Sequence, residues 1–396
     1  MNPLLNPFSP GAGSQPPELA GRQEILDQAL LTLERVKLGR SERSFFLVGL
    51  RGVGKTVVLQ KILALATQNE YQACLVEAHE NKPLSLLLLP QLRRILFSLD
   101  SAAQISSKVK RGLRVLKSFM SGLKLKAYDI EVSLDIDSEV GAADSGDLEA
   151  DLSQVFLALG EAAQDRGTAV AILIDEMQYL SEKELSALIM AIHQMAQKAL
   201  PVVVIGAGLP QLVGQAVKSK SYAERLLTYP SLGPLSQEAA EHALQEPVRL
   251  QGMEFTSEAI QKIIQATQGY PYFLQEWGYQ AWKFAEKSPI DAFVIQEASK
   301  VALSRLDENF FRARFDRLTP REKDYLRALA EFGEAPQRSG VVAERLGLDV
   351  KTAAPLRNSL IKKGMIYSPT HGDTAFTVPL FDKFMMRVIP AFSAQE

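Results

Sequence analysis

Residues 45–56 read FFLVGLRGVGKT and join two kinds of local pattern. The first four residues are apolar and predict a short buried strand, whereas the apolar spacing over 57–68 is typical of an amphipathic helix. The loop between them has the spacing G-x-x-x-x-G-K-T. Glycines let the backbone wrap so that successive N–H groups point inward, and the helix that follows adds the positive end of its dipole. We therefore expect an anion-binding loop at the end of a buried strand.

The last two residues of the loop indicate which anion it binds. In a loop of this spacing Lys55 reaches the β- and γ-phosphates of a nucleoside triphosphate, and the hydroxyl of Thr56 ligates Mg²⁺. The alternative is a chance glycine turn between a strand and a helix, which the complete spacing in this context disfavours. The sequence thus predicts ATP and Mg²⁺ as cofactors. The residues expected at the nucleotide are Gly49, Arg51, Gly52, Val53, Gly54, Lys55, Thr56 and Val57.

A second apolar segment ends in two carboxylates. Residues 169–180, AVAILIDEMQYL, predict a buried strand that is followed by Asp175 and Glu176. We expect Asp175 to hold Mg²⁺ and Glu176 to polarise the water that attacks the γ-phosphate. The alternative is an aspartate that caps a helix beside a surface glutamate. Together with the loop, the two carboxylates predict an ATPase.

The order of helical and strand patterns predicts the fold. They alternate from Gly21 to about Leu232, which predicts an α/β P-loop fold with a mostly parallel sheet and flanking helices. Helix then follows helix over 236–309, which is typical of a separate α-helical lid. The predicted domains are an extended N-terminal arm (1–20), an ATPase core (21–232) with a charged insertion (101–151), the helical lid (233–316) and a C-terminal winged helix-turn-helix domain (317–390).

The composition excludes several classes of protein. With 46% hydrophobic and 23% charged residues among 396, the chain is not disordered as a whole. A net charge of −2 means that affinity for nucleic acid must come from a local patch. The single cysteine, Cys74, permits no intrachain disulfide, and no Cys/His cluster has zinc spacing. Since the chain starts without a signal-peptide pattern and has no apolar run of membrane-spanning length, we expect a cytoplasmic protein without a membrane partner.

The charged insertion separates its charges by sign. Residues 101–128 hold seven basic side chains and no acid, and residues 129–151 hold nine acids and no base. The basic half predicts either a surface for a polyanion or one side of an internal neutralisation. We favour the second interpretation, in which the two halves neutralise each other.

The order of these motifs resembles that of AAA+ ATPases, and in particular their origin-recognition and initiator-like (Orc/Cdc-type) branch. The shared features are the Gly21-Arg22 segment, the P-loop, the Asp-Glu strand, a later strand, an arginine, a helical lid and a C-terminal winged helix. The resemblance implies that Gly21 and Arg22 lie against the adenine. It also implies that Arg225 is an arginine finger for the γ-phosphate of a neighbouring subunit in an ATP-dependent homo-oligomer. For Arg225 the alternative is a surface ion pair with Glu224 or another acid.

Two positions depart from that branch. The strand over 201–212 has the residues GAG at 206–208 where the branch has a polar side chain that positions water or the γ-phosphate, and this predicts slow hydrolysis. The lid has GYP at 269–271, which resembles the signalling ATPases of the STAND group, in which the proline packs on the adenine. As plain chemistry, Gly269 ends one helix and Pro271 opens the next.

The last domain has the features of a nucleic-acid-binding module. Thr319 and Glu322 have the spacing of a capping box, and Gly347 lies in the turn of a helix-turn-helix. Residues 317–390 hold 12 basic and 8 acidic side chains, a local net charge of +4. Recognition helices of this kind lie in the major groove, and clustered positive charge is typical of phosphate binding. The alternative is a winged helix that docks protein. The residues expected to contact duplex DNA are Lys351, Thr352, Arg357, Lys362, Lys363 and His371.

Two functions fit these features. The first is an AAA+ ATPase that couples the binding and hydrolysis of Mg²⁺-ATP to DNA engagement or partner assembly, and the basic third helix of the last domain favours it. The second is a STAND-like switch with slow hydrolysis and a winged helix that docks protein partners. The lid motif at 269–271 and the missing polar residue at 206–208 favour the switch.

Overall fold

The computed structural model describes residues 1–11, 13–99, 106–122 and 137–391. The chain divides into two compact units. The α/β unit consists of Gln23–Val48 and Lys55–Ser231, and the lid unit consists of Met1–Arg22, Gly49–Gly54 and Leu232–Glu396. The domain boundaries predicted from the sequence stay predictions.

The α/β unit is built on a five-stranded parallel sheet with the order β2-β3-β4-β1-β5. This confirms the predicted α/β fold with a parallel sheet. Every residue of β3 and β4 is buried, which explains why these strands read as continuous apolar runs. The sequence did not predict β5, because it has only two residues. The strands are β1 (Ser44–Val48), β2 (Gln72–Glu77), β3 (Val170–Asp175), β4 (Val202–Gly208) and β5 (Leu227–Thr228).

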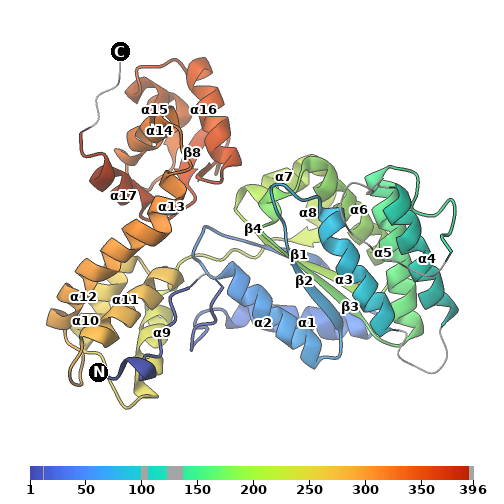
Figure 1. Cartoon of the computed structure of the whole chain (residues 1–396), viewed down its shortest axis with the longest axis horizontal. Helices are drawn as coiled ribbons and strands as arrows, with labels where there is room; N and C mark the ends of the chain where they lie inside the picture. Colours follow the sequence, from blue (N-terminus) through green and yellow to red (C-terminus); the bar gives the residue numbers. More distant parts are fainter. Residues whose placement is uncertain (12, 100–105, 123–136, 392–396) are drawn as a thin grey trace. The chain divides into compact units, whose positions relative to one another are not determined.

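Helices cover both faces of this sheet. In Figure 1, α1 and α2 lie on one side of the strands and α5 and α6 on the other. One apolar core joins the strands to helices α3 to α7. The helices of the unit are α1 (Gln23–Lys37), α2 (Lys55–Gln68), α3 (Leu84–Ser98), α4 (Ser107–Gly122), α5 (Leu148–Asp165), the short η3 (Met177–Tyr179), α6 (Glu182–Gln197), α7 (Gln211–Ser219) and α8 (Ala223–Leu226).

The charged insertion contributes α4, and several of its basic side chains are paired within the unit. Arg111 forms ion pairs with Glu139 at 3.2 Å and with Glu161 at 3.0 Å, and Lys108 pairs with Glu161 at 2.9 Å. Neutralisation is thus observed at α4, although one of the acids lies on α5 rather than in the acidic half of the insertion. Residues 123–136 lie outside the described part of the chain.

The lid unit begins with a bundle of helices onto which the N-terminal arm packs. Phe8 is 2% exposed and belongs to the apolar core of the bundle. Asn6 Nδ2 donates a hydrogen bond to the carbonyl oxygen of Tyr279 at 3.1 Å. The arm is therefore a packed part of the lid unit. The elements here are η1 (Pro3–Leu5), α9 (Gln237–Arg249), α10 (Ser257–Thr267), α11 (Pro271–Phe284), α12 (Ala292–Arg305), η4 (Leu306–Phe311) and α13 (Arg312–Phe315).

Residues 317–390, which we call the C-terminal domain, have the element order expected of a winged helix-turn-helix. Its three short strands form an antiparallel sheet with the order β6-β8-β7. The capping box of Thr319 and Glu322 is present at the start of α14. We call residues 366–376 the wing. The elements are α14 (Pro320–Ala330), β6 (Gln337–Arg338), α15 (Ser339–Arg345), α16 (Val350–Lys362), β7 (Ile366–Tyr367), β8 (Asp373–Phe376) and α17 (Phe381–Val388).

Within the described residues, none of the helices combines the length and the apolar character that a bilayer crossing requires.

Candidate functional site

The α/β unit brings together Lys55, Thr56 and Asp175. α2 begins at Lys55, and β3 ends at Asp175. Thr56 Oγ1 donates a hydrogen bond to Asp175 Oδ2 at 2.5 Å. Lys55 is only 7% exposed, and its positive charge acts on the same carboxylate. The two groups predicted to hold Mg²⁺ thus lie in direct contact beside the predicted phosphate-binding lysine.

The environment of Asp175 disfavours its charged form. Burial raises the pKa of this carboxyl, and the neighbouring charge of Glu176 raises it too. The hydrogen bond from Thr56 and the charge of Lys55 act in the opposite direction without cancelling the effect. A buried carboxylate of this kind is stabilised by a nearby cation.

Glu176 is held by a side chain that the sequence reasoning did not single out. Its backbone is left-handed, with φ 53° and ψ 36°, and its N–H donates to Asp175 Oδ1 at 2.8 Å. The Glu176 carboxylate accepts a hydrogen bond from Gln178 Nε2. Gln178 Oε1 in turn accepts a hydrogen bond from the N–H of Leu209 at 3.1 Å, directly after β4. Gln178 therefore links the predicted catalytic carboxylate to the end of the neighbouring strand.

The glycines at the end of β4 leave the space that this link requires. A Cβ atom on Gly206 would lie 2.0 Å from Met177 Sδ, and one on Gly208 would lie 3.2 Å from Gln178 Oε1. The expected polar side chain is thus absent from β4 itself, but an amide from the loop after β3 reaches the same strand end. The sequence contained one signal for this arrangement, namely Gly206 and Gly208. A glycine within a strand indicates that another segment approaches the backbone closely.

Replacing Gln178 with leucine is expected to lower kcat for ATP hydrolysis by roughly 10- to 100-fold, because a hydrogen bond to a charged group is worth about 1.5–3 kcal/mol. The affinity for ATP should stay within about twofold, since Gln178 acts through Glu176 and not on the nucleotide. Nucleotide binding and steady-state phosphate release, measured separately, check this prediction. Gln197→Leu, an exposed change on α6, is the control. Equal losses of kcat in both variants would contradict a positioning role.

The glycine loop, residues 49–54, packs within the lid unit. Arg22 is 7% exposed, and its Nη2 donates to the carbonyl oxygens of Val53 at 3.1 Å and of Gly233 at 2.6 Å. The guanidinium thereby fixes the loop to the segment that follows β5. The loop also requires glycine for steric reasons, because a Cβ atom on Gly49 would lie 2.2 Å from the carbonyl oxygen of Leu232.

Two further hydrogen bonds join the loop backbone to the lid helices and to the C-terminal domain. The N–H of Tyr272, in the first turn of α11, donates to the carbonyl oxygen of Gly52 at 3.2 Å. The N–H of Arg51 donates to the carbonyl oxygen of Thr377, directly after β8, at 3.0 Å. Three separate parts of the lid unit, namely Arg22, α11 and the C-terminal domain, thus hold this loop.

The remaining predicted nucleotide contacts belong to several different segments of the chain. Gly21 has φ 66°, and a Cβ atom there would lie 2.9 Å from the Cβ of Ala239. Pro271 is the first residue of α11, as its plain chemistry predicted. Arg225 is exposed on α8, and no ion pair with Glu224 is found among the described residues. The roles of these residues at adenine and as an arginine finger stay predictions.

A comparison with known protein families gives one match that includes the glycine loop, Thr56, Asp175 and Gln178. Residues 18–205 match the family described as AAA ATPase domain. This part of the chain is similar to AAA ATPase domains. Residues 308–385 match a second family, described as a domain of unknown function (DUF8462). No curated protein matches the chain.

Two solved structures resemble the chain over nearly its whole length. The Walker-type ATPase PABY2304 of Pyrococcus abyssi has a TM-score of 0.60 and 16% identity, covering 96% of this chain and 99% of that chain. The ORC2 protein of Aeropyrum pernix, solved as ADPNP-ADP complexes, has a TM-score of 0.53 and 13% identity, covering 96% and 98%. At such identities the likeness concerns the fold, so it does not assign the AAA ATPase domain to the origin-recognition branch.

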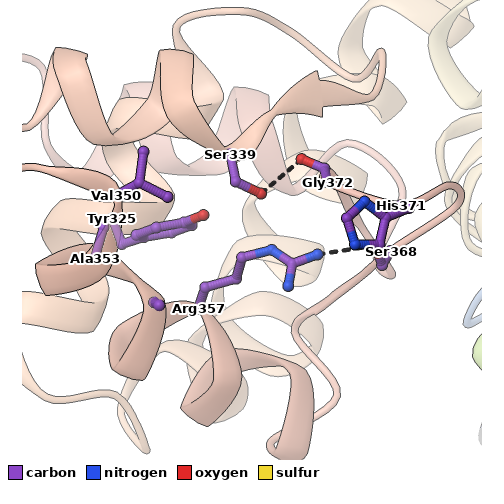
Figure 2. A pocket seen from close by; sticks show the side chains of 9 residues that line it. Tyr325, Ser339, Val350, Ala353, Arg357, Ser368, His371 and Gly372 are labelled. Atoms are coloured by element: carbon purple, nitrogen blue, oxygen red, sulfur yellow. Dashed lines mark hydrogen bonds between the residues drawn. The ribbon is translucent and has the colours of Figure 1, made fainter.

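Beyond the AAA ATPase domain, Arg357 does not have the geometry expected of a base-reading side chain. Its Nε donates to Thr374 Oγ1, and its Nη2 donates to Ser368 Oγ and to the carbonyl oxygen of Asp373, each at 2.8 Å. Figure 2 shows the side chain extending from α16 toward Ser368 and His371 of the wing. The predicted fork onto a guanine would require these three bonds to break.

The other predicted DNA contacts differ in how accessible their charges are. Lys351 and Lys362 are exposed on α16, and His371 is exposed in the wing. Thr352 Oγ1 donates at 2.6 Å to Oδ2 of Asp349, the N-cap residue of α16, so its hydroxyl is already hydrogen-bonded at the helix start. Lys363 Nζ lies 2.7 Å from Glu322 Oε2, so its positive charge forms an ion pair within the domain.

The ion pair of Glu322 with Lys363 makes the stability of the C-terminal domain depend on pH. Burial by itself would raise the pKa of Glu322, but hydrogen bonds from Lys363, Ser359 and the Thr319 N–H lower it from 4.5 to about 2. A carboxyl with a lower pKa in the folded state stabilises the fold above its unfolded pKa. We therefore expect unfolding to become easier as the pH falls from about 4.5 toward about 2.

Glu322→Gln should remove this part of the pH dependence and should cost about 1–3 kcal/mol at neutral pH, because Lys363 loses its charged partner. Denaturant unfolding followed at several pH values checks both effects. Glu344→Gln, an exposed change on α15, should leave the pH dependence intact. A parent-like pH profile in Glu322→Gln would show that this ion pair does not stabilise the domain.

Proposed function

We propose that the chain is a Mg²⁺-ATP-dependent switch, in which binding and hydrolysis of ATP control whether the C-terminal domain engages duplex DNA. The observation that carries the proposal is the pair of backbone hydrogen bonds that join the glycine loop to the lid at Gly52 and to the C-terminal domain at Arg51. A loop that binds phosphates and also contacts a second domain makes nucleotide binding and the state of that domain mutually dependent.

The residues present fit Mg²⁺ and nucleotide phosphates. A hydroxyl and a carboxylate, the hard oxygen ligands that Mg²⁺ prefers, lie 2.5 Å apart at Thr56 and Asp175. Mg²⁺ at phosphate sites takes few protein ligands and keeps several waters. When bound, Mg²⁺ would neutralise charge on the phosphates.

Three side chains of the protein have separate roles in ATP hydrolysis. Lys55 is a compact point charge for the β- and γ-phosphates. Glu176 accepts the proton of the water that attacks the γ-phosphate. Gln178 keeps Glu176 oriented, but its hydrogen bond also occupies one oxygen of that carboxylate. The residues GAG at 206–208, in place of a polar side chain on β4, support slow turnover, which suits a switch better than a motor.

The choice of duplex DNA as partner rests on charge. α16 has no acidic side chain over 350–362, and Lys351 and Lys362 are exposed near its two ends. Both positions suit phosphate contacts, which hold the backbone without reading sequence. Lys363, which is paired with Glu322, and Arg357, which is bonded to the wing, are not part of this proposal.

The test measures binding of fluorescent duplex DNA by the full chain with Mg²⁺-ATP, with Mg²⁺-ADP and without nucleotide. A coupling of 1–3 kcal/mol predicts affinities that differ by about 5- to 150-fold between nucleotide states. Lys55→Ala should bind DNA without responding to nucleotide. Changing Lys351 and Lys362 together to glutamate should weaken all duplex sequences alike and should flatten the salt dependence, by a log–log slope of about 0.9 per lost phosphate contact.

Absence of duplex binding at low salt in every nucleotide state would reject the DNA part of the proposal. Hydrogen exchange at residues 370–380 then separates the remaining outcomes. A change in exchange on ATP binding would support a switch with a protein partner, as the lid motif at 269–271 suggests. No change would also reject the coupling between the loop and the C-terminal domain.

A further inference from the structure

The C-terminal domain contains a pocket of about 280 Å³ between α14, the start of α15, α16 and the wing. We propose that this pocket binds a small organic anion, namely a carboxylate joined to a compact apolar body. The site is separate from the nucleotide site, and the inference goes beyond the proposed switch. It rests on a cation without a counter-charge, on an apolar wall and on the size of the pocket.

The cation is Arg357, which lines the pocket and is half-buried. All three of its hydrogen bonds go to neutral oxygens, two hydroxyls and one backbone carbonyl. The neighbouring carboxylate of Asp373 is used elsewhere, because it pairs with Arg338 Nε at 3.2 Å. Within the described residues, no carboxylate forms an ion pair with Arg357. A guanidinium removed from water without a counter-charge is costly, and an anion in the pocket would offset that cost with charge-assisted hydrogen bonds.

The wall beside this charge is apolar. Val350, Ala353 and Ala354 have the i, i+3, i+4 spacing that places them on one face of α16, and all three line the pocket. Tyr325 of α14 also lines the pocket (Figure 2), and its side chain is fully buried beneath the apolar residues of α16. Burial raises the pKa of Tyr325, so its hydroxyl stays neutral and can donate. These walls disfavour free inorganic phosphate, which would leave them unfilled.

The size of the pocket limits the ligand further. Pockets for drug-sized molecules and cofactors measure about 300–1,000 Å³, so this one is slightly smaller than that range. It suits a ligand with about the size of one aromatic ring and an acidic group. Such a ligand would contact both α16 and the wing, the two elements whose relative position matters for DNA engagement.

The experiment uses benzoate as the probe and benzamide as its neutral counterpart of the same shape, with ligand-observed NMR on the full chain. A ligand of this size is expected to bind with a dissociation constant on the order of 1 mM. Arg357→Gln should weaken benzoate binding by about tenfold or more, through the lost charge. Ala354→Leu should weaken it similarly, because the added side chain fills the pocket. Lys362→Gln removes one charge from the same helix outside the pocket and should have no effect.

Arg357→Gln also removes bonds to the wing, so circular dichroism must first show that the variant is folded. If it is not, Ala354→Leu and the comparison with benzamide decide the question by themselves. The proposal is overturned if benzamide binds as well as benzoate, or if folded Ala354→Leu binds benzoate like the parent. It also fails if Lys362→Gln loses as much affinity as Arg357→Gln, or if the parent does not bind benzoate at about 10 mM.

Discussion

Lys55→Ala is expected to lower the affinity for ATP by roughly 10²- to 10⁴-fold. Lys55 is buried at the first residue of α2, where an ammonium group has three donors to offer to phosphate oxygens. One hydrogen bond to a charged group is worth about 1.5–3 kcal/mol, and two such bonds give a loss of this size. Equilibrium titration with a fluorescent ATP analogue in the presence of Mg²⁺ measures the effect.

Lys61→Ala is the matched control, because Lys61 lies on the same helix with an exposed side chain. This variant should bind ATP like the parent. An affinity of Lys55→Ala within a few-fold of the parent would mean that the loop does not hold the β- and γ-phosphates. The assignment of residues 49–56 as the nucleotide site would then be wrong.

Glu176→Gln is expected to keep ATP binding and to lower the hydrolysis rate by about 10²- to 10⁴-fold, the usual contribution of a general base. The change preserves the size of the side chain but removes the group that accepts a proton from water. Phosphate release and nucleotide binding, measured on the same preparation, separate the two effects. The variant should also hold the protein in its ATP-bound state long enough to measure DNA binding in that state.

Glu182→Gln, a change of an exposed acid at the start of α6, should leave the hydrolysis rate unchanged. Hydrolysis by Glu176→Gln at the parent rate would show that another group accepts the proton. A large loss of ATP affinity in Glu176→Gln would indicate that the carboxylate acts through the metal site and not as a base.

The fold and the centre of the candidate site could be predicted because their signals are local. A buried strand, a glycine loop and a helix follow one another within residues 45–68, and the Asp175-Glu176 pair follows directly on an apolar strand. In a parallel sheet such loops meet at the same edge, so Thr56 and Asp175 were expected to lie together. The lid and the order of elements in the C-terminal domain were likewise visible as changes of periodicity.

The missed features depend on contacts between segments that are distant in the sequence. Gln178 reaches the end of β4 only because β3 and β4 pair with Ile174 opposite Gly206. The sequence alone does not reveal which residues of two strands lie opposite each other. Arg357 was predicted to face outward because its helix is basic. The hydroxyl groups of the wing that bind it come from a separate segment and have no pattern of their own.

The division of the chain into two units also has a consequence for how the protein is made. The lid unit takes its first parts from Met1–Arg22 and Gly49–Gly54, whereas the rest begins at Leu232. Phe8 packs in a core with residues such as Phe255 and Trp277, which leave the ribosome some 250 residues later. During translation the α/β unit can therefore complete its sheet first. The side chain of Phe8 meanwhile stays unpacked until its partners have been synthesised. Such long-range contacts slow folding and leave hydrophobic surface open to chaperones.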